Sequence, residues 1–189
     1  GPRALGGRSI LGDPRSDSTQ KNLNLKVKYR ESFRPFAPAI LEEDTFKWFK
    51  DDFESPYMLL VTHVNDSKRK KITEEEEDFF GIEKLNISRS TIPAVTHVDY
   101  SARIQTVSEK RNPEFYKLIS KFKELTNCPI LVNTSFNIRS EPIVCSPAEA
   151  YKCFMGTELD VLSIGSFILI KEEQSDKSKN IYLNEFELD

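Results

Sequence analysis

Two helix start signals flank a short apolar run in the second half of the chain, and this alternation constrains the fold most. Asn112-Pro113-Glu114 offers a capping side chain, a proline at the first helical position and an acid in the first turn. The apolar run 129–132 follows that helix, and Ser146-Pro147-Ala148-Glu149 starts a second helix with a capping box, ending near Gly156. Strands interleaved with helices predict an α/β sheet.

The remaining elements are predicted from periodicity. Apolar residues at every second position favour an extended segment over residues 22–27, and a short helix is expected over residues 42–50. The first capped helix carries a one-sided apolar stripe: Phe115, Leu118, Ile119, Phe122 and Leu125. Further strands are expected at residues 39–41, 57–64, 94–98, 103–107 and 161–170.

The length of 189 residues suits a single domain. Residues 65–90 form a polar insert whose basic run Lys68-Arg69-Lys70-Lys71 precedes the acidic run 74–77, which suggests a self-paired surface excursion. A charged tail begins near residue 172. Because the first residues lack an initiator Met and resemble the inside of a protein, we expect the chain to be a fragment of a larger one.

Cysteine and histidine usage points away from metal or thiol chemistry. Cys128, Cys145 and Cys153 have no C-x-x-C spacing, so neither a disulfide framework nor a zinc ribbon is expected, and a reducing cytoplasm is the default. His63 and His97 lie in apolar runs and are expected in the core, not on a metal. The longest apolar run, 161–170, has about half the length of a membrane span.

Basic charge is concentrated at one end of the chain. Residues 1–35 contain eight Lys or Arg and three acids, whereas the whole chain has a net charge of -3. Such clustering attracts phosphate groups. Lys28 and Arg30 stand two apart, where an extended backbone would point both the same way, and Ser135 and Asn137 follow a buried strand, where α/β sheets bind ligands. Together these residues suggest an anionic nucleotide.

Arginine supplies the other cationic candidates, Arg3, Arg34 and Arg103. The apolar neighbours of Arg103 predict a buried strand, so its charge needs an anionic partner such as Asp99 or a bound phosphate. Neither a P-loop nor a G-x-G-x-x-G motif occurs, so side chains must hold the phosphates.

Several long blocks resemble one family. Gly1-Pro2-Arg3-Ala4-Leu5-Gly6, Lys28-Tyr29-Arg30-Glu31 with Phe33-Arg34-Pro35-Phe36-Ala37-Pro38, Thr96-His97-Val98-Asp99, Ala102-Arg103-Ile104-Gln105-Thr106-Val107 and Asn133-Thr134-Ser135-Phe136-Asn137 are similar to the carboxy-terminal domain of O-carbamoyltransferases of the nodulation and antibiotic-tailoring type. The similarity runs in order from residue 1 to about 170. It departs at Gly7, Tyr100-Ser101 and Ser140, and the insert at 65–90 is longer than expected.

That resemblance implies a YrdC-like twisted mixed sheet with packed helices, in which the K-x-R and S-x-N signature falls on Lys28, Arg30, Ser135 and Asn137. It implies that ATP and carbamoyl phosphate form carbamoyl adenylate here, and that a separate amino-terminal kinase-like domain passes the carbamoyl group to an acceptor hydroxyl. Mg²⁺ is expected with the ATP, with no ligand named. The implied catalytic residues are Lys28, Arg30, Arg103 and Ser135, and the implied substrate-binding residues are Arg3, Arg34, Asn133 and Asn137.

Two alternatives stay open. A nucleic-acid-binding module would use the same basic segment, although few aromatic residues interleave with its cations to stack on bases. A non-catalytic domain retained for docking to a partner is the other. Salt-dependent RNA affinity that ATP does not displace would favour the first alternative.

Overall fold

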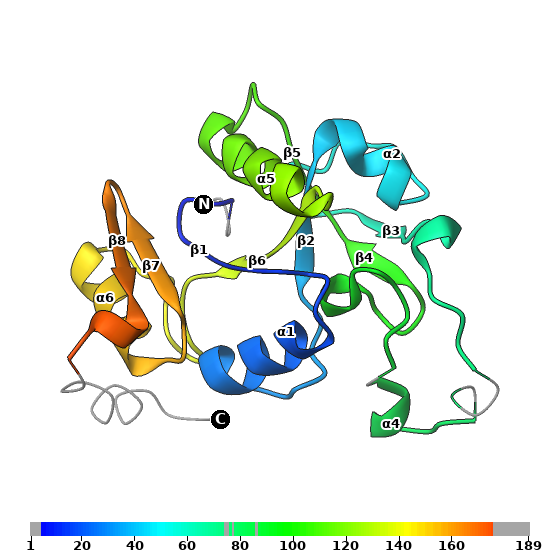
Figure 1. Cartoon of the computed structure of the whole chain (residues 1–189), viewed down its shortest axis with the longest axis horizontal. Coiled ribbons are helices and arrows are strands. Elements are labelled where there is room, and N and C mark those ends of the chain that lie inside the picture. The colour runs from blue at the N-terminus through cyan, green and yellow to red at the C-terminus, as the bar shows by residue number, and fades with distance from the viewer. Residues whose placement is uncertain (1–4, 74–75, 77, 86, 176–189) are drawn as a thin grey trace.

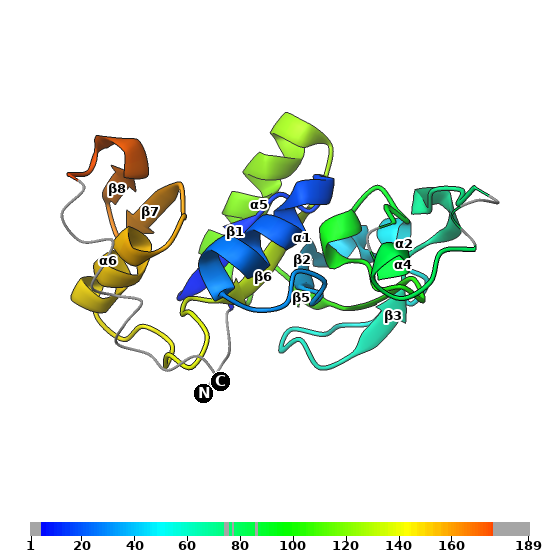
Figure 2. The ribbon, with the colours of Figure 1, turned by 90° about the horizontal axis from the view of Figure 1, so that it is seen from below.

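A four-stranded mixed sheet forms the centre of the computed structural model, which describes residues 5–73, 76, 78–85 and 87–175 (Figure 1). The strand order is β1-β6-β2-β5; β6 is antiparallel to both neighbours, and β2 is parallel to β5. Two antiparallel pairs, β3-β4 and β7-β8, lie outside this sheet, on opposite sides of it (Figure 2). The described chain is therefore a single α/β domain, as the alternation of elements predicted, and its sheet is mixed, as the resemblance implied.

The strands are β1 Ser9–Gly12, β2 Ala37–Leu41, β3 Val61–His63, β4 Ser101–Arg103, β5 Gln105–Val107, β6 Ile130–Ser135, β7 Val161–Ile164 and β8 Phe167–Ile170. The α-helices are α1 Asp17–Asn22, α2 Thr45–Trp48, α4 Ile82–Leu85, α5 Pro113–Thr126 and α6 Pro147–Gly156. Short helical turns of other types are η1 Leu23–Lys28, η2 Glu42–Asp44, η3 Asp66–Lys68, η4 Pro93–Val95 and η5 Lys171–Glu173.

Both faces of the central sheet are buried. Alternate side chains of β2 and β6 enter different clusters: Ile40 and Ile130 face the main core, whereas Leu41 and Leu131 face α5. Figure 1 shows α5 and α1 on opposite sides of β1 and β6. Burial on two faces explains why β2 is apolar throughout instead of alternating.

The two capped helices form as predicted. The Asn112 side chain accepts a hydrogen bond from the Phe115 N–H at the start of α5. Ser146 and Glu149 make the reciprocal bonds of a capping box at the start of α6. In the predicted stripe of α5, Phe115 and Ile119 are buried, but Leu118 and Leu125 are exposed. The signals for a helix start depend on neighbouring residues alone, so they predict the start of a helix independently of the tertiary fold.

Residues 22–27 are helical and not extended, which corrects one sequence prediction. The α1 helix passes directly into η1, where the Tyr29 N–H donates to the Asn24 carbonyl in the wider π-type pattern. Leu23 and Val27, four residues apart, are buried, whereas Leu25 is exposed. Apolar residues at 23, 25 and 27 fit a strand, and the pair at 23 and 27 also fits one face of a helix. Burial of this i, i+4 pair stabilises the helix.

Three predicted strands were also wrong in extent or type. Only Val61–His63 of the 57–64 run is a strand, because a turn closed by the Ser55 side chain precedes it. The 94–98 run begins with a helical turn at Pro93–Val95 instead of a strand. The 161–170 run is the β7-β8 hairpin, with Gly165 at a φ of 56° in its turn. Apolar character predicted neither the chain direction nor full burial, since Leu59, Phe167 and Ile168 are exposed.

The 65–90 insert and the tail are described only in part. Hydrogen bonds from Lys70 N–H to the Arg89 carbonyl and from Thr91 N–H to the Lys68 carbonyl close the neck of the insert. Arg69 pairs with Asp66 at 3.1 Å. The predicted pairing partners at 74, 75 and 77, and the tail beyond residue 175, lie outside the described residues.

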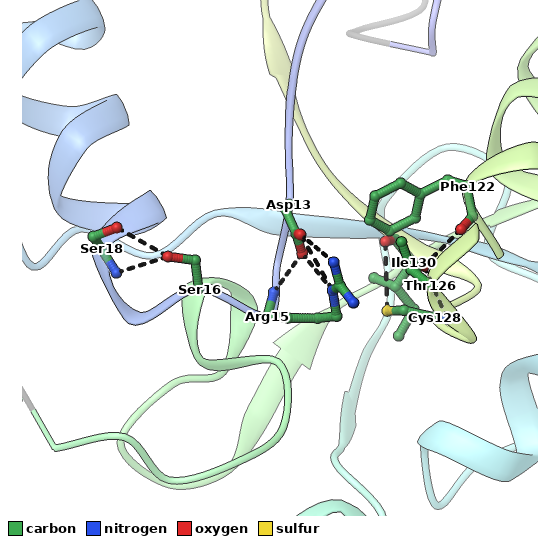
Figure 3. A network of polar contacts seen from close by, with 8 residues as sticks. All are labelled: Asp13, Arg15, Ser16, Ser18, Phe122, Thr126, Cys128 and Ile130. Atoms are coloured by element: carbon green, nitrogen blue, oxygen red, sulfur yellow. Dashed lines mark hydrogen bonds and ion pairs between the residues drawn. The ribbon is translucent and has the colours of Figure 1, made fainter.

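A compact polar network fixes the connection after β1 (Figure 3). Arg15 donates to both carboxylate oxygens of Asp13, and the shortest nitrogen–oxygen distance is 2.6 Å. The hydrogen bond from Arg15 lowers the pKa of the Asp13 carboxyl below its ordinary value. The Arg15 guanidinium also lies 5.5 Å from the centre of the Phe122 ring. Through these two contacts, Arg15 connects the segment after β1 to α5.

Gly6 offers a stability test of how the opening segment packs on α5. Its φ is 95°, and a Cβ there would lie 2.6 Å from Cγ of Phe115. We expect Gly6→Ala to lower the free energy of unfolding by about 2 kcal/mol, because the change adds both strain and overlap. Gly7→Ala is the matched control, since a Cβ at Gly7 meets nothing within 4 Å. Urea denaturation of both variants measures the difference, and equal stabilities would refute this account.

Candidate functional site

A cleft of about 410 Å³ opens beside the carboxyl end of β6. Asn133, Thr134 and Ser135 of β6 line one side of it, together with Asn137 from the following turn. Arg30, Arg34 and Arg103 line it from other segments of the chain, and Pro35, Phe36, Ala37, Met58 and Ile143 complete it. Six of the eight site residues expected from the sequence therefore line one cavity.

Pairing of the strands brings these distant residues together. Asn133 in β6 lies opposite Ala37 in β2, so the segment carrying Arg30 and Arg34 arrives at this end of the sheet immediately before β2. Arg103 is the last residue of β4, and a single residue separates it from β5, the strand that pairs with β2. Hydrogen bonding along the sheet thus gathers residues from three separate parts of the sequence.

The arginines give the cleft a positive character. Among its described lining residues there are three Arg and no Asp or Glu. Burial lowers the pKa of Arg30 to about 10, and the nearby charge of Arg34 acts in the same direction. Two cations held this close repel each other, so an anion placed between them is stabilised.

Arg103 lies on an exposed surface, contrary to the buried position expected from its neighbours. In β4 Ser101 and Ala102 are buried, whereas Arg103, the last residue of the strand, is exposed. Its Nη2 lies 3.9 Å from the Met58 sulfur. The expected partner Asp99 instead accepts a hydrogen bond from the Ser101 N–H at 3.0 Å. Arg103 can therefore present its guanidinium to a ligand.

Lys28 lies beneath the cleft, with only 4% of its surface exposed. Its Nζ donates to the Ser135 carbonyl at 2.5 Å and to the carbonyl and Oδ1 of Asn137, both at 2.8 Å. Burial lowers the pKa of Lys28 to about 7, and the charge of Arg30 contributes. Tyr29 adopts a left-handed conformation with φ of 50°, so Lys28 and Arg30 are not parallel neighbours on a strand.

The polar groups at the end of β6 are tied to one another. The Asn133 amide donates to Oε1 of Gln105 at 2.5 Å, which links β6 to β5 beneath the cleft. The Ser135 hydroxyl donates to Oδ1 of Asn137, and the Asn137 amide donates to the Glu141 carbonyl, both at 2.6 Å. The strand end is therefore preorganised, a condition for electrostatic stabilisation of a reacting anion.

The remaining sequence candidates are not part of this cleft. Arg3 lies outside the described residues. His63 is exposed on β3, so its predicted core position was wrong, whereas His97 is half-buried and burial lowers its pKa. Within the described ranges, no three His, Cys, Asp or Glu side chains gather closely enough to hold a metal ion. Cys145 is exposed beside the α6 capping box.

Sequence patterns alone missed two residues that organise the cleft. Asn24 is completely buried and contacts the segment that carries Arg30 and Arg34, and Gln105 holds Asn133. The sequence offered one signal for the role of Gln105, because an amide in a fully buried strand needs a hydrogen-bonding partner. Asn24 had none, because an extended segment was expected there.

A second cavity of about 420 Å³ lies on the other side of the 32–35 segment, between α1, η4 and the insert. Lys21, Arg89 and His97 contribute its basic groups, and Phe33 and Val98 contribute apolar surface. Arg89 donates to the Ile87 and Lys84 carbonyls, so its guanidinium supports the wall of this cavity. The polar strand end and the converging arginines distinguish the first cleft.

The buried ammonium predicts a pH dependence of stability. Because the Lys28 pKa is about 7 in the fold and 10.5 ordinarily, the unfolded chain binds the extra proton between these values. The Lys28 contribution to the free energy of unfolding should therefore rise with pH across this window, by at most about 1.4 kcal/mol per unit.

Urea denaturation at pH 7 and pH 9 checks this prediction by comparing the wild type with Lys28→Met. The difference between the two should shift in favour of the wild type at pH 9. Lys117→Met, which removes an exposed lysine paired with Glu114, serves as the control and should show no such shift. Parallel profiles for wild type and Lys28→Met would contradict the prediction.

Among the residues that the structure describes, no helix combines the length and the apolarity needed to cross a bilayer.

Comparison with known proteins gives a match over almost the whole chain. Residues 1–171 match the family described as Carbamoyltransferase C-terminus. The chain is 42% identical over 178 residues to nodulation protein NolO of Bradyrhizobium diazoefficiens, with 93% of this chain and 29% of NolO covered. It is 39% identical over 144 residues to 3'-hydroxymethylcephem-O-carbamoyltransferase of Amycolatopsis lactamdurans, with 76% of this chain and 23% of that enzyme covered.

An uncharacterized protein of Synechocystis, sll1178, is 56% identical over 190 residues, with 100% of this chain and 31% of that protein covered. The chain thus spans only about a quarter to a third of the length of these curated relatives.

Proposed function

Because the chain belongs to the carbamoyltransferase C-terminus family, as its sequence blocks predicted, we propose that it activates carbamoyl phosphate with ATP for O-carbamoyl transfer. The product of this half-reaction is carbamoyl adenylate. A separate amino-terminal kinase-like domain would then pass the carbamoyl group to an acceptor hydroxyl. The observation that carries the proposal is the convergence of Arg30, Arg34 and Arg103 on the polar end of β6.

The charge of the proposed substrates suits this cleft. ATP and carbamoyl phosphate are both polyanions, and planar guanidinium groups match pairs of phosphate oxygens. Arg34 and Arg103 are exposed and free to turn toward a ligand, whereas Arg30 is half-buried and held in place. The lining amides and hydroxyls of Asn133, Ser135 and Asn137 are neutral. They can accept and donate hydrogen bonds to a carbamoyl group.

In the proposed reaction, water first cleaves the anhydride bond of carbamoyl phosphate, which releases inorganic phosphate and leaves carbamate. A carbamate oxygen then forms a bond to the α-phosphorus of ATP. The bond from that phosphorus to the bridging oxygen breaks, and pyrophosphate leaves with the electron pair. The protein supplies no nucleophile in this scheme. Arg30, Arg34 and Arg103 stabilise the charge that accumulates on the phosphoryl oxygens, and the fixed strand end orients the carbamoyl group.

Lys28 has two roles in this proposal. In the structure its ammonium holds Ser135 and Asn137 through their oxygens. Polyphosphate above it would favour its protonated form, because a nearby anion raises the pKa of an amine. Lys28 would then add positive charge beneath the reacting phosphate without leaving its position.

Mg²⁺ would accompany the nucleotide. The described lining residues include no carboxylate, so phosphate oxygens and water would hold the ion. Its contribution would be to neutralise charge on the polyphosphate. We also propose that the sheet is of the YrdC-like type, with the K-x-R and S-x-N signature at Lys28, Arg30, Ser135 and Asn137.

Exchange of labelled pyrophosphate into ATP, dependent on carbamoyl phosphate, tests adenylate formation without an acceptor. We expect the chain to catalyse this exchange and Arg103→Ala to slow it by about a hundredfold, as when one transition-state donor is removed. Arg111→Ala is the matched control, because Arg111 pairs with Glu42 and Glu54 away from the cleft.

An equal loss in both arginine variants would contradict the assignment of Arg103 to the site. Absence of exchange in the wild-type chain, together with RNA binding that ATP does not displace, would instead support the nucleic-acid-binding alternative.

A further inference from the structure

Asn24 is a completely buried amide in the η1 segment, and its side chain makes hydrogen bonds to residues 30–34. Its Nδ2 donates to the Ser32 carbonyl at 3.0 Å and to the Arg34 carbonyl at 2.8 Å. Its Oδ1 accepts a hydrogen bond from Nε of Arg30 at 2.6 Å. One side chain thus holds three points of residues 30–34.

The bond to Arg30 determines which part of its guanidinium remains for a ligand. Because Nε is hydrogen-bonded to Asn24, the two terminal amino groups are the part of the guanidinium that remains for a ligand in the cleft that Arg30 lines. The guanidinium also lies 4.8 Å from the centre of the Phe36 ring, which limits its rotation. Terminal amino groups on a fixed plane can contact two oxyanions side by side.

The main chain of Asn24 also holds the segment that carries Arg30 in place. Its carbonyl accepts hydrogen bonds from the Tyr29 N–H and, at 3.0 Å, from the Arg30 N–H. Tyr29 adopts its left-handed conformation within this turn. Backbone and side chain of Asn24 therefore fix both the direction of residues 29–34 and the orientation of Arg30.

We propose that Asn24 is a positioning residue for the anion cleft, holding Arg30 and the Arg34 backbone where their guanidinium groups meet phosphate oxygens. This inference rests on the proposed function for its ligand, a polyphosphate. It goes beyond that function by assigning part of the affinity to a residue that cannot touch the ligand. Losing Asn24 should cost affinity through Arg30 and not through general unfolding.

A matched control exists in the same segment. The Gln20 amide donates to the Phe33 carbonyl at 2.8 Å, so Gln20→Ala also loosens this segment but leaves the bond to Arg30 intact. Asn24→Leu offers a second variant of nearly unchanged size. It removes both the acceptor for Nε of Arg30 and the donors to the Ser32 and Arg34 carbonyls.

The first measurement needs no ligand. The Nε–H signal of Arg30, assigned in proton–nitrogen NMR spectra with Arg30→Met, should exchange with water at least about tenfold more slowly than that of exposed Arg34, because it is hydrogen-bonded. The protection should be lost in Asn24→Ala and kept in Gln20→Ala. Equal exchange for Arg30 and Arg34 in the wild type would overturn the inference.

The second measurement is a double-mutant cycle with pyrophosphate as the titrated ligand. Asn24→Ala should weaken binding by about tenfold in the wild-type background, and by less than about twofold when Arg30 is already Met. If Asn24→Ala does not fold, Asn24→Leu, which also removes the acceptor for Nε of Arg30, takes its place in the cycle with the same expectation. Equal losses in both backgrounds would overturn the inference while leaving the proposed function intact. Failure of the wild type to bind pyrophosphate would remove both.

Discussion

The buried ammonium of Lys28 is the contact on which the cleft depends. It joins the end of the η1 helical segment to oxygens of Ser135 and Asn137, more than a hundred residues later in the chain. An unpaired charge with 4% exposure would be strongly unfavourable, and the oxygens around it offset part of that cost, although burial still lowers the pKa of Lys28 to about 7. The same contact determines where β6 ends relative to Arg30. The contact between the Lys28 ammonium and these oxygens therefore sets the distance between residues 28–34 and the end of β6.

Electrostatics of the cleft follow from this geometry. Three arginines converge from segments that the sheet brings together, and the described lining residues contain no acid to neutralise them. Two surface arginines elsewhere are paired with acids: Arg15 with Asp13, and Arg111 with Glu54. Repulsion between the arginines of the cleft is unfavourable, and a bound anion relieves it. Because the hydrogen-bond donors are already fixed, they lose little entropy when the anion binds. The arrangement suits recognition of a polyphosphate better than a stabilising role in the fold.

Sequence patterns predicted the elements whose signals are local. The caps of α5 and α6 were found because capping needs only residues three apart, and the strand at β6 was found because both of its faces are buried. The predictions failed where apolar runs carried no directional information. Residues 22–27 became helix because Leu23 and Val27 share a buried face, and residues 161–170 folded back at Gly165. Apolar character alone does not determine the backbone conformation, because hydrogen-bond partners far along the chain decide it.

The sequence by itself determined the chemistry of the candidate site, since cations, amides and a hydroxyl are properties of residue types. It also determined the family, because the matching blocks extend in order over residues 1–171. Only the tertiary structure decided which of these groups face a ligand. It exposed Arg103, placed Lys28 beneath the cleft, and made Asn24 the support of Arg30. The physical reason is that orientation depends on strand pairing and on buried hydrogen bonds between distant residues, neither of which a local pattern contains.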